Sequence, residues 1–396
     1  MKARFAVNIE FQDILLKGRV VDISVRNGTI ASISPTVRMA QQVILPLPVD
    51  PHVHLDKTFT ANRCQPAEPG LFGAIEAMAT DALNWNETDL RNRMEKALAE
   101  AYQNGISAMR SHVDWTQEEA PLAWSVLGEV EQDWRGKIAI QRASLTPLDM
   151  LGDLECGTAI ASQVHRDSEV MGSFVYRNKN LDVLLEQVFR HAAHYELMLD
   201  FHVDEGLEPE AAAFDRIIDL TQQFSMAGRV LCGHACSLSV RPMDEVSRVI
   251  AEAAAAGVAL TVLPTTNLWL QDNQNGTTPR LRGLAPMHEL RAAGVPVLLG
   301  ADNVADPFFS MGTYDALDVL RNASVVAHLA PADWLDSITT NPARAMGRDI
   351  NEIKIGGSAD FILIEGYSWE DALRNPNASR QVFRAGHTQS VGKEAA

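Results

Sequence analysis

The sequence predicts a (β/α)8 barrel, flanked by a small β-sandwich to which both ends of the chain contribute. Eight apolar runs with strand character follow one another between residues 43 and 299, separated by amphipathic helical stretches. Several of these stretches end in a glycine just before the next strand, as a left-handed helix end requires: Gly105, Gly228, Gly257 and Gly294. Candidate polar residues follow the carboxyl ends of the runs, where barrels of this type carry their active sites.

The first part of the chain is predicted to be β structure. Residues 1–46 contain short strands, with a hairpin signal at Arg26–Gly28. From about residue 47 the pattern changes to strands that alternate with helices. The eight predicted barrel strands are Val43–Val49, Ile106–Val113, Lys137–Leu145, Glu169–Tyr176, Met198–Val203, Arg229–Gly233, Val258–Pro264 and Val295–Leu299.

Strand character returns near the end of the sequence. The last helical pattern covers residues 333–341, and apolar strand-like runs follow at 356–364 and 381–384. We therefore expect residues 47–348 to form the barrel. Residues 1–46 and 349–396 are expected to combine into the flanking β-sandwich.

The composition excludes several classes of function. The chain carries 51 acidic against 34 basic residues, a formal net charge of −17, and lacks a Lys/Arg cluster that could follow a phosphate backbone. We therefore expect no nucleic acid partner and no membrane partner. The first residues lack the apolar core of a secretory signal, which favours a cytoplasmic location. The four cysteines make no disulfide framework. As a separate expectation, the protein forms a homo-oligomer.

A pair of histidines two residues apart, His52 and His54, follows the first apolar run. In an extended strand, residues i and i+2 face the same side, so both imidazoles can reach one metal ion. The same spacing also occurs on solvated strand edges, so the pair alone leaves both interpretations open. His202, His234 and Asp302 at later strand ends favour the metal interpretation, because the strand ends of a barrel meet at one mouth.

These side chains suit one divalent ion, zinc or iron(II). Imidazoles and a carboxylate are typical ligands of such ions, and a position remains for water, whose pKa the metal lowers towards neutrality. Glu205, three residues past His202, can move a proton between that water and a substrate nitrogen. The fourth strand ends in Phe174–Arg177 without a lysine that could bridge two ions, and Lys179 lies further out, which favours one metal.

Six motifs occur in consistent order along the chain: Asp50–Asp56, Arg110–Asp114, Phe201–Glu205, Gly233–His234, Leu263–Gln271 and Asp302–Phe309. As a set they resemble the amidohydrolase superfamily, and within it the bacterial cytosine deaminase branch, which includes relatives that hydrolyse aminotriazines. The similarity runs from about residue 44 to 346. Residues 357–363 also resemble a strand of the superfamily's flanking β domain.

The resemblance implies a role for each matching residue. The implied metal ligands are His52, His54, His202 and Asp302. Glu205 would shuttle protons, His234 would hydrogen-bond the attacking water or the developing oxyanion, and Asp302 would also accept a proton from the water. The implied enzyme is a hydrolase of carbon–nitrogen bonds in cyclic amidines. Metal hydroxide would attack a ring C=N carbon of a small nitrogen heterocycle, and ammonia would leave.

Two departures from the cytosine deaminase pattern concern the substrate. The family's glutamine at the end of the third strand is replaced here by the segment Gln141–Thr146, in which Gln141 lies too early in the strand. The paired acids of the last strand are Asp302–Asn303 in this chain, and the tryptophan that follows is Phe308. We therefore expect a related cyclic amidine, imide or lactam rather than cytosine. The candidate substrate contacts are Ser144, Trp269, Asn303 and Phe308.

Several interpretations stay open. Trp269 and Phe308 can stack on a ring, or they can pack the mouth of the barrel. His112 can support a ligand from behind or be a ligand itself, and we favour support. The same site can also open a cyclic amide or imide, or remove an alkylamine from a triazine-like ring. A catalytically inactive scaffold barrel is a further hypothesis, which the retention of every ligand position disfavours.

Overall fold

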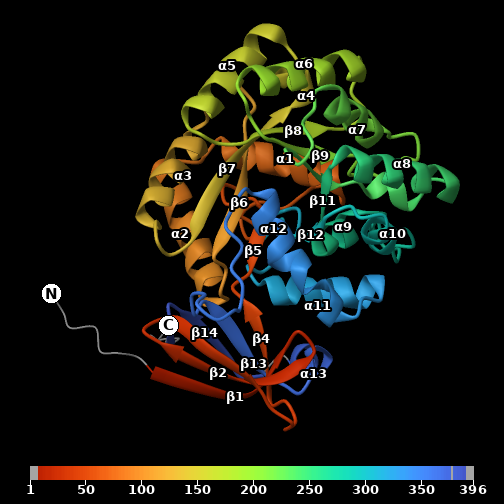
Figure 1. The fold of residues 1–396 in the computed structure, drawn as a ribbon. Helices are drawn as coiled ribbons and strands as arrows, with labels where there is room; N and C mark the ends of the chain where they lie inside the picture. The colour runs from red at the N-terminus through yellow and green to blue at the C-terminus, as the bar shows by residue number, and fades with distance from the viewer. Residues whose placement is uncertain (1–7, 376–377, 389–396) are drawn as a thin grey trace.

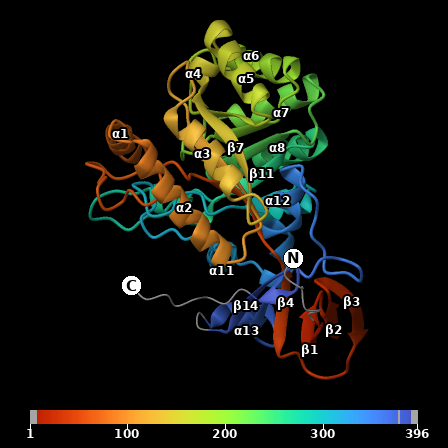
Figure 2. The same cartoon turned by 90° about the vertical axis from the view of Figure 1, so that its left-hand side faces the viewer.

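The computed structural model describes residues 8–375 and 378–388, which form two sheets, with helices packed around the larger one (Figure 1). The larger sheet has eight strands, β5 to β12, and neighbouring strands follow the order of the sequence. The smaller sheet has seven strands in the order β15-β14-β13-β4-β1-β2-β3, so strands from both ends of the sequence meet in it. Figure 2 shows the smaller sheet below the barrel, with α1 at the side.

The larger sheet is a closed parallel barrel. Its strands are β5 (Val49–Val53), β6 (Ala108–Asp114), β7 (Ala139–Pro147), β8 (Met171–Val175), β9 (Leu199–Val203), β10 (Val230–His234), β11 (Ala259–Val262) and β12 (Val297–Leu299). A parallel bridge between Val53 and Asp302 joins the two ends of the sheet. The amide of Asp302 donates to the carbonyl of His52 at 2.9 Å across the same seam. The predicted (β/α)8 barrel is confirmed.

Helices connect the barrel strands and pack around the barrel. They are α1 (Leu71–Ala82), α2 (Glu87–Gln103), α3 (Leu122–Asp133), α4 (Leu148–Leu151), α5 (Leu154–Arg166), α6 (Leu181–His194), α7 (Ala213–Gln223), η1 (Cys236–Ser239), α8 (Met243–Ala256), α9 (Pro264–Leu270), α10 (Met287–Ala292), α11 (Ala316–Ala327), η2 (Pro331–Ile338) and α12 (Thr340–Ala345). A further helix, α13 (Trp369–Arg374), lies between two strands of the smaller sheet. Several neighbours contact in chain order, for example α6 with α7 and α7 with α8. In α7, Phe214, Ile217 and Ile218 are buried and Asp219 is exposed, as the amphipathic pattern predicts.

Three of the four glycines predicted to end helices do so, whereas Gly228 lies in a turn after α7, which ends at Gln223 and has Ser225 as its left-handed residue. Gly105, Gly228, Gly257 and Gly294 have φ angles of 90, 76, 71 and 89°. These angles are in the left-handed region, which is free of steric cost only for glycine. At Gly257 the backbone N–H donates to the carbonyls of Ala253 and Ala254, which closes the last turn of α8 before β11 begins.

The smaller sheet has its own core. Its strands are β1 (Asn8–Leu16), β2 (Arg19–Arg26), β3 (Thr29–Pro35), β4 (Gln42–Pro46), β13 (Phe361–Glu365), β14 (Arg380–Arg384) and β15 (His387–Thr388). The ring of Phe11 lies 5.5 Å from that of Phe361 and 5.0 Å from that of Phe383, both edge-on. Early and late strands thus bury aromatic side chains against each other.

The first barrel strand lies later than predicted, and this prediction was wrong. The run Val43–Val49 was assigned to one barrel strand, but its first part forms β4 of the smaller sheet and β5 begins only at Val49. Pro48 lies in the two-residue gap between them. Proline cannot donate to a strand ladder, so it favours the crossing from one sheet to the other. His52 therefore lies within β5 rather than after it.

Two other boundaries differ from the prediction. The helical pattern at residues 333–341 forms parts of η2 and α12. The strand predicted at 356–364 begins only at Phe361. Gly356 has a φ of 83°, which belongs to a turn and not to a strand.

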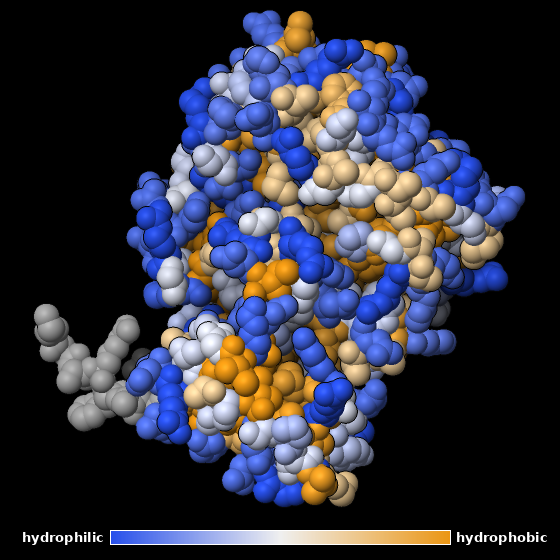
Figure 3. Space-filling model, viewed as in Figure 1, coloured by the Kyte–Doolittle hydropathy of each residue, from blue (hydrophilic) through white to orange (hydrophobic). Residues whose placement is uncertain are grey.

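The main hydrophobic core lies between the barrel and its helices. Trp124, Phe189 and Phe214 come from helices and are almost completely buried against the strands. On the face shown in Figure 3, hydrophilic side chains cover most of the outer helices. Among the helices of the described residues, none has the length and apolar character needed to cross a membrane.

Candidate active site

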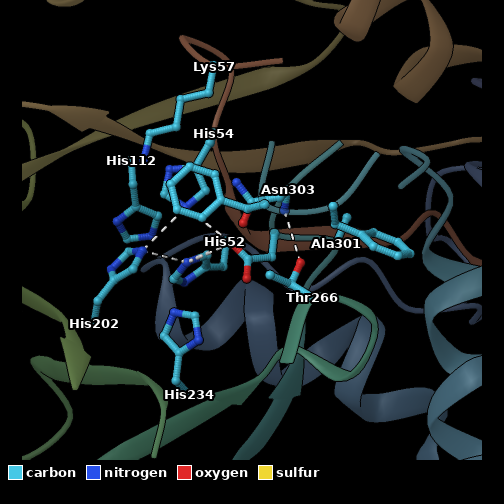
Figure 4. A network of polar contacts seen from close by, with 12 residues as sticks. His52, His54, Lys57, His112, His202, His234, Thr266, Ala301 and Asn303 are labelled. Atoms are coloured by element: carbon cyan, nitrogen blue, oxygen red, sulfur yellow. Dashed lines mark hydrogen bonds and ion pairs between the residues drawn. The ribbon is translucent and has the colours of Figure 1, made fainter. Parts of the chain in front are cut away.

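Histidines from three strands and one aspartate converge at the carboxyl end of the barrel (Figure 4). His52 is in β5 and His54 follows that strand by one residue, while His202 is in β9. His234 is the last residue of β10, and Asp302 lies just past β12. The structure therefore brings together all five residues that the sequence singled out at strand ends.

The ligand-type atoms of these side chains face one another. The Nε2 atom of His202 lies 3.0 Å from that of His52 and 3.3 Å from that of His54. Oδ1 of Asp302 lies 3.1 Å from Nε2 of His54 and 3.6 Å from Nε2 of His52. These four side chains are all buried, so water does not separate them.

The protonation state of these histidines suits a metal. Burial lowers the pKa of His52, His54 and His202 well below the ordinary value, so the imidazoles are neutral near neutral pH. A neutral imidazole carries one N–H, and three Nε2 atoms in mutual contact cannot all be satisfied by hydrogen bonds to each other. Neutral imidazoles with a carboxylate are the donor set that binds a divalent transition ion. The residues present fit such an ion.

Backbone strain and a buried carboxylate fix the strand ends. His234 and Asp302 have φ angles of 71 and 60°, in the left-handed region that costs a non-glycine residue about 1 kcal/mol. Oδ1 of Asp50 accepts from the amide of His52 at 3.1 Å, and Oδ2 accepts from the amide of Ala301 at 3.2 Å. Asp50 thus braces both sides of the seam between β5 and β12.

Glu205 and His234 form a second group beside the histidines. Oε1 of Glu205 lies 3.4 Å from Nδ1 of His234, and both side chains are buried. Burial raises the pKa of Glu205 well above its ordinary value, and the charge of Asp302 raises it further. A carboxyl with a raised pKa can hold and release a proton near neutral pH.

The orientation of His234 follows from Asn267, a residue in α9. Nδ2 of Asn267 donates to Nδ1 of His234 at 3.0 Å, which leaves the ring hydrogen on Nε2. Nε2 of His234 has no hydrogen-bond partner among the described residues, and His234 lines the cavity. His234 can therefore donate a hydrogen bond into the cavity. Asn267 lies within a motif noted in the sequence, but nothing in the pattern indicated this contact.

His112 lies behind the converging histidines. Its ring centre is 4.1 Å from that of His52 and 4.7 Å from that of His202. Beneath it, Nη1 of the fully buried Arg110 lies 2.6 Å from Oδ2 of Asp200. Nε2 of His112 lies 3.7 Å from the same oxygen. His112 therefore lies behind the proposed ligands, where it can hold His52 and His202 in position. His52, His112 and Asp200 also lie close enough to one another to share an ion.

A cavity of about 490 Å³ opens onto this group. His54, His202, His234 and Asp302 line its inner end, together with Asn303 and Phe308. Apolar side chains make most of the remaining wall, among them Leu71, Ile75, Met78 and Leu83 from α1 and its end, Trp85, Leu122, Leu145 and Phe174. Such a mostly apolar wall with few polar groups is typical of a small-molecule site.

Two charged residues that the sequence analysis did not assign to the substrate, Lys57 and Asp114, also line the cavity. Nζ of Lys57 lies 2.9 Å from Oδ1 of Asp114, and it lies 5.0 Å from the ring centre of Phe308. Burial alone would lower the pKa of Lys57, but the charges of Asp114 and Asp56 raise it above its ordinary range. The signal for this pair was weak, because both residues occur inside motifs dominated by histidines.

Two of the four candidate substrate contacts do not line this cavity. Ser144 is buried in β7, where its hydroxyl donates to the carbonyl of Gly172 and accepts from the amide of the same residue. Trp269 is 43% exposed, and its ring packs 6.0 Å from that of Phe309. Gln141 also lies elsewhere, because its Oε1 accepts two hydrogen bonds from Arg110. Asn303 and Phe308 remain as substrate-contact candidates.

Comparisons with known proteins place this geometry in context. The sequence profile described as "Amidohydrolase family" matches residues 71–389. A pterin deaminase from Rhizobium rhizogenes is 34% identical over 378 residues, which covers 92% of this chain and 86% of the relative. This coverage includes both sheets.

Two solved structures of similar fold are those of a deaminase and an aminohydrolase. The 5-methylcytosine deaminase from Klebsiella pneumoniae, liganded with 5-fluorocytosine, matches with a TM-score of 0.84 and 22% identity, over 96% of this chain and 97% of that one. The N-isopropylammelide isopropylaminohydrolase from Burkholderia multivorans matches with a TM-score of 0.78 and 21% identity, over 96% and 98% of the two chains. At this level of identity the likeness concerns the fold.

Proposed function

Because the chain belongs to the amidohydrolase family, we propose that it is a hydrolytic deaminase of a small nitrogen heterocycle and that this ring is a 2-amino-4-oxopteridine. The observation that carries the proposal is the convergence of three Nε2 atoms and Asp302 at the inner end of one cavity. This arrangement sits in a chain that is 34% identical to a pterin deaminase over almost its whole length.

The donor set fits a divalent metal ion, and we propose that the site binds zinc or iron(II). His52, His54, His202 and Asp302 would hold it. The donor atoms of His52, His54 and His202 lie within 4.8 Å of one another, and so do those of His52, His234 and Asp302. An ion in such a site supplies Lewis acidity, and it makes water a nucleophile near neutral pH. Imidazole and carboxylate donors suit both metals, so the donor set alone does not decide between them.

The protein side chains would move the protons. Glu205, whose raised pKa favours the protonated form, would donate a proton to the ring nitrogen and regain one from the attacking water, and the water's second proton would go to the leaving amine, which departs as ammonia. Its burial and raised pKa support this role. The Nε2–H of His234 would donate to the developing negative charge, and the contact from Asn267 fixes that hydrogen. Asp302 would accept the water's second proton and pass it to the leaving amine.

The substrate contacts support a ring other than cytosine. Gln141, which lies nearest in sequence to the cytosine-binding glutamine of the family, is engaged with Arg110. Phe308 offers an apolar face at the cavity wall, and Asn303 lies beside it with its Nδ2 donating to Asp306 at 2.8 Å. A cavity of about 490 Å³ leaves room for a bicyclic ring and a substituent.

An alternative reaction is the removal of an alkylamine. The chain is 22% identical over 337 residues to an N-isopropylammelide isopropyl amidohydrolase from Pseudomonas, which covers 82% of this chain. The apolar wall of the cavity could accept an alkyl group on the leaving nitrogen. Ring opening of a cyclic amide is the other alternative. The expected absence of nucleic acid and membrane partners, the cytoplasmic location and the homo-oligomer stay predictions.

A screen for released ammonia tests the proposal. Metal-loaded protein is incubated with pteridines, pyrimidines, aminotriazines and cyclic imides, and ammonia and the ring product are measured. We expect ammonia and a 2,4-dioxo product from 2-amino-4-oxopteridines. Alkylamine release or ring opening in place of ammonia would favour an alternative. Absence of turnover on every ring class by protein that retains its metal would refute the proposal.

A further inference from the structure

The side chains of Lys57 and Asp114 form a donor and acceptor pair that faces the cavity. We propose that this pair selects the substrate by its lactam edge: the ammonium of Lys57 donates to the ring carbonyl, and the carboxylate of Asp114 accepts from the adjacent ring N–H. The inference rests on the proposed function and deepens it, since it names the ring edge that the site recognises.

The position of the pair supports this role. Lys57 follows β5 by four residues and Asp114 is the last residue of β6, so both lie at the mouth of the barrel. Both line the cavity, together with His54. Figure 4 shows Lys57 beside His54 and His112. Of the described residues that line the cavity, these two and Asp302 are the only ones with an acidic, lysine or arginine side chain.

The bonding of the pair leaves capacity for a ligand. An ammonium has three N–H donors, and the ion-pair partner of Lys57 among the described residues is Asp114, at 2.9 Å. The side chain of Lys57 is only 6% exposed, so bulk water does not readily satisfy the remaining donors. The side chain of Asp114 is 34% exposed, which leaves its carboxylate open on the cavity side. A substrate that satisfies these groups replaces their hydration.

The scaffold holds both side chains in place before any ligand binds. Oδ2 of Asp56 accepts from the amide of Asp114 at 3.0 Å, which ties the loop after β5 to the end of β6. Nη1 of Arg93, from α2, donates to the carbonyls of Asp56 and Thr58, one on either side of Lys57. Groups fixed in this way lose little entropy on binding and discriminate more sharply.

The chemistry of the pair matches a lactam edge. In the unit –C(=O)–NH–, an acceptor and a donor lie side by side, which is the complement of an ammonium next to a carboxylate. If the oxo group is replaced by an amino group, an N–H faces the ammonium. If the ring nitrogen is methylated, the carboxylate loses its donor. Phe308, directly under Nζ of Lys57, would support the flat ring at this edge.

The test compares three substrates with a series of variants in the metal-loaded enzyme. The substrates are 2-amino-4-oxopteridine, 2,4-diaminopteridine and the N3-methyl derivative of the first, and deamination at C2 is followed by chromatography of the product. The variants are Lys57→Met, Asp114→Ala and the double variant Lys57→Met/Asp114→Leu, which leaves no unpaired charge. Metal content and the unfolding midpoint are measured for each protein.

We expect wild-type kcat/KM to be about 10- to 100-fold higher for the 4-oxo ring than for either analogue, as for a hydrogen bond to a charged group. Lys57→Met should lower the oxo to amino ratio only in part, because the 4-amino ring also lacks the ring N–H that Asp114 accepts from. Asp114→Ala should bring the N–H to N-methyl ratio close to one, and the double variant should lose both preferences. Each variant should retain its metal.

Lys96→Met is the matched control. Lys96 is exposed and its ammonium lies 3.7 Å from the ring centre of Phe59, so the change also removes a lysine from an aromatic face, but outside the cavity lining. Its substrate ratios should equal those of the wild type. The inference is overturned if the wild type deaminates the rings without these preferences, or if folded, metal-bearing variants keep them. Failure of the wild type to deaminate any of the rings would instead overturn the proposed function, and the inference with it.

Discussion

Arg142 in β7 and Glu169, two residues before β8, form a buried ion pair, and its disruption tests how much a charge pair away from the active site stabilises the fold. Nε of Arg142 lies 3.1 Å from Oε1 of Glu169. Nη1 donates to the carbonyl of Trp124 at 3.1 Å, and the guanidinium lies 4.6 Å from the ring centre of Trp124. The substitution Arg142→Met removes these three interactions. It keeps the backbone hydrogen bond from the amide of residue 142 to Oε2 of Glu169, at 2.8 Å.

The magnitude follows from the interactions lost. A hydrogen bond to a charged partner is worth about 1.5–3 kcal/mol, a neutral one about 1 kcal/mol, and a cation–π contact about 0.5–1 kcal/mol. The sum agrees with the cost of about 3–5 kcal/mol for removing one partner of a buried pair. Methionine keeps the packing of the aliphatic stem, so we expect a loss of about 3 kcal/mol in the free energy of unfolding near neutral pH.

The loss should depend on pH. Burial raises the pKa of Glu169 to about 7, and the charge of Arg142 opposes that rise. An acid whose folded pKa is raised stabilises the protein fully below its unfolded pKa, and the contribution disappears as the pH rises through the folded pKa. Without Arg142 the pKa of Glu169 in the folded state rises further. The stability of the variant therefore continues to fall above about pH 7, where the stability of the wild type no longer depends on Glu169. The deficit should therefore grow by roughly 1 kcal/mol between about pH 6 and about pH 8.

Urea unfolding of wild type and Arg142→Met at these two pH values measures the deficit. The double variant Arg142→Met/Glu169→Leu supplies the control, because it removes the acid that the single variant leaves without a partner. Its deficit should be smaller and should shrink by roughly 1 kcal/mol from about pH 6 to about pH 8, because only the wild type loses the contribution of Glu169 over this range. The reasoning fails if Arg142→Met loses less than about 1 kcal/mol, or if its deficit is the same at both pH values.

Three further predictions concern the active site and the flanking sheet. Glu205→Gln should retain metal and lose about 10²- to 10⁴-fold in kcat, measured with the best ring substrate, because the proton carrier is gone. The control is Glu210→Gln, which changes an exposed acid on the same loop. Wild-type turnover by Glu205→Gln would contradict the assigned proton shuttle. Asp302→Ala should lower the metal bound per chain after dialysis, since the carboxylate lies 3.1 Å from Nε2 of His54, and full retention of the ion would remove Asp302 from the proposed ligands. Phe361→Ala should cost about 3–5 kcal/mol of unfolding free energy, because its buried ring contacts Phe11 and Phe383; a loss below about 1 kcal/mol would show that the sheet repacks.

The sequence was informative about the barrel because its signals are local and repeated. Strand runs, amphipathic helices and glycines such as Gly257 each report on the backbone at their own position. The convergence of His52, His202 and Asp302 also followed from the sequence, since the architecture itself brings strand ends to one mouth. The predicted barrel architecture was therefore enough to expect that most of the candidate site residues lie together.

Features that depend on the partners of a side chain were harder to predict from the sequence. Ser144 lies near the end of a barrel strand, as predicted, but its hydroxyl is engaged with Gly172 of the neighbouring strand and not with the cavity. The contact between Lys57 and Asp114 joins the loop after β5 to the end of β6, and no local sequence pattern specifies how these two segments lie relative to each other. Position along a strand can be inferred from periodicity, whereas the direction of a side chain within a crowded interior requires its neighbours.

The seam of the barrel connects the fold to the proposed chemistry. His52 and Asp302 come from β5 and β12, the two strands that the closing of the barrel brings together. The amide of Asp302 reaches the carbonyl of His52 at 2.9 Å, and Asp50 accepts from the amides of His52 and Ala301. Because Asp302 has a left-handed φ of 60°, its carboxylate stays next to the histidines only while these bonds hold its backbone. An open seam would separate the donors, so closure of the barrel is a condition for the metal site and not merely its background.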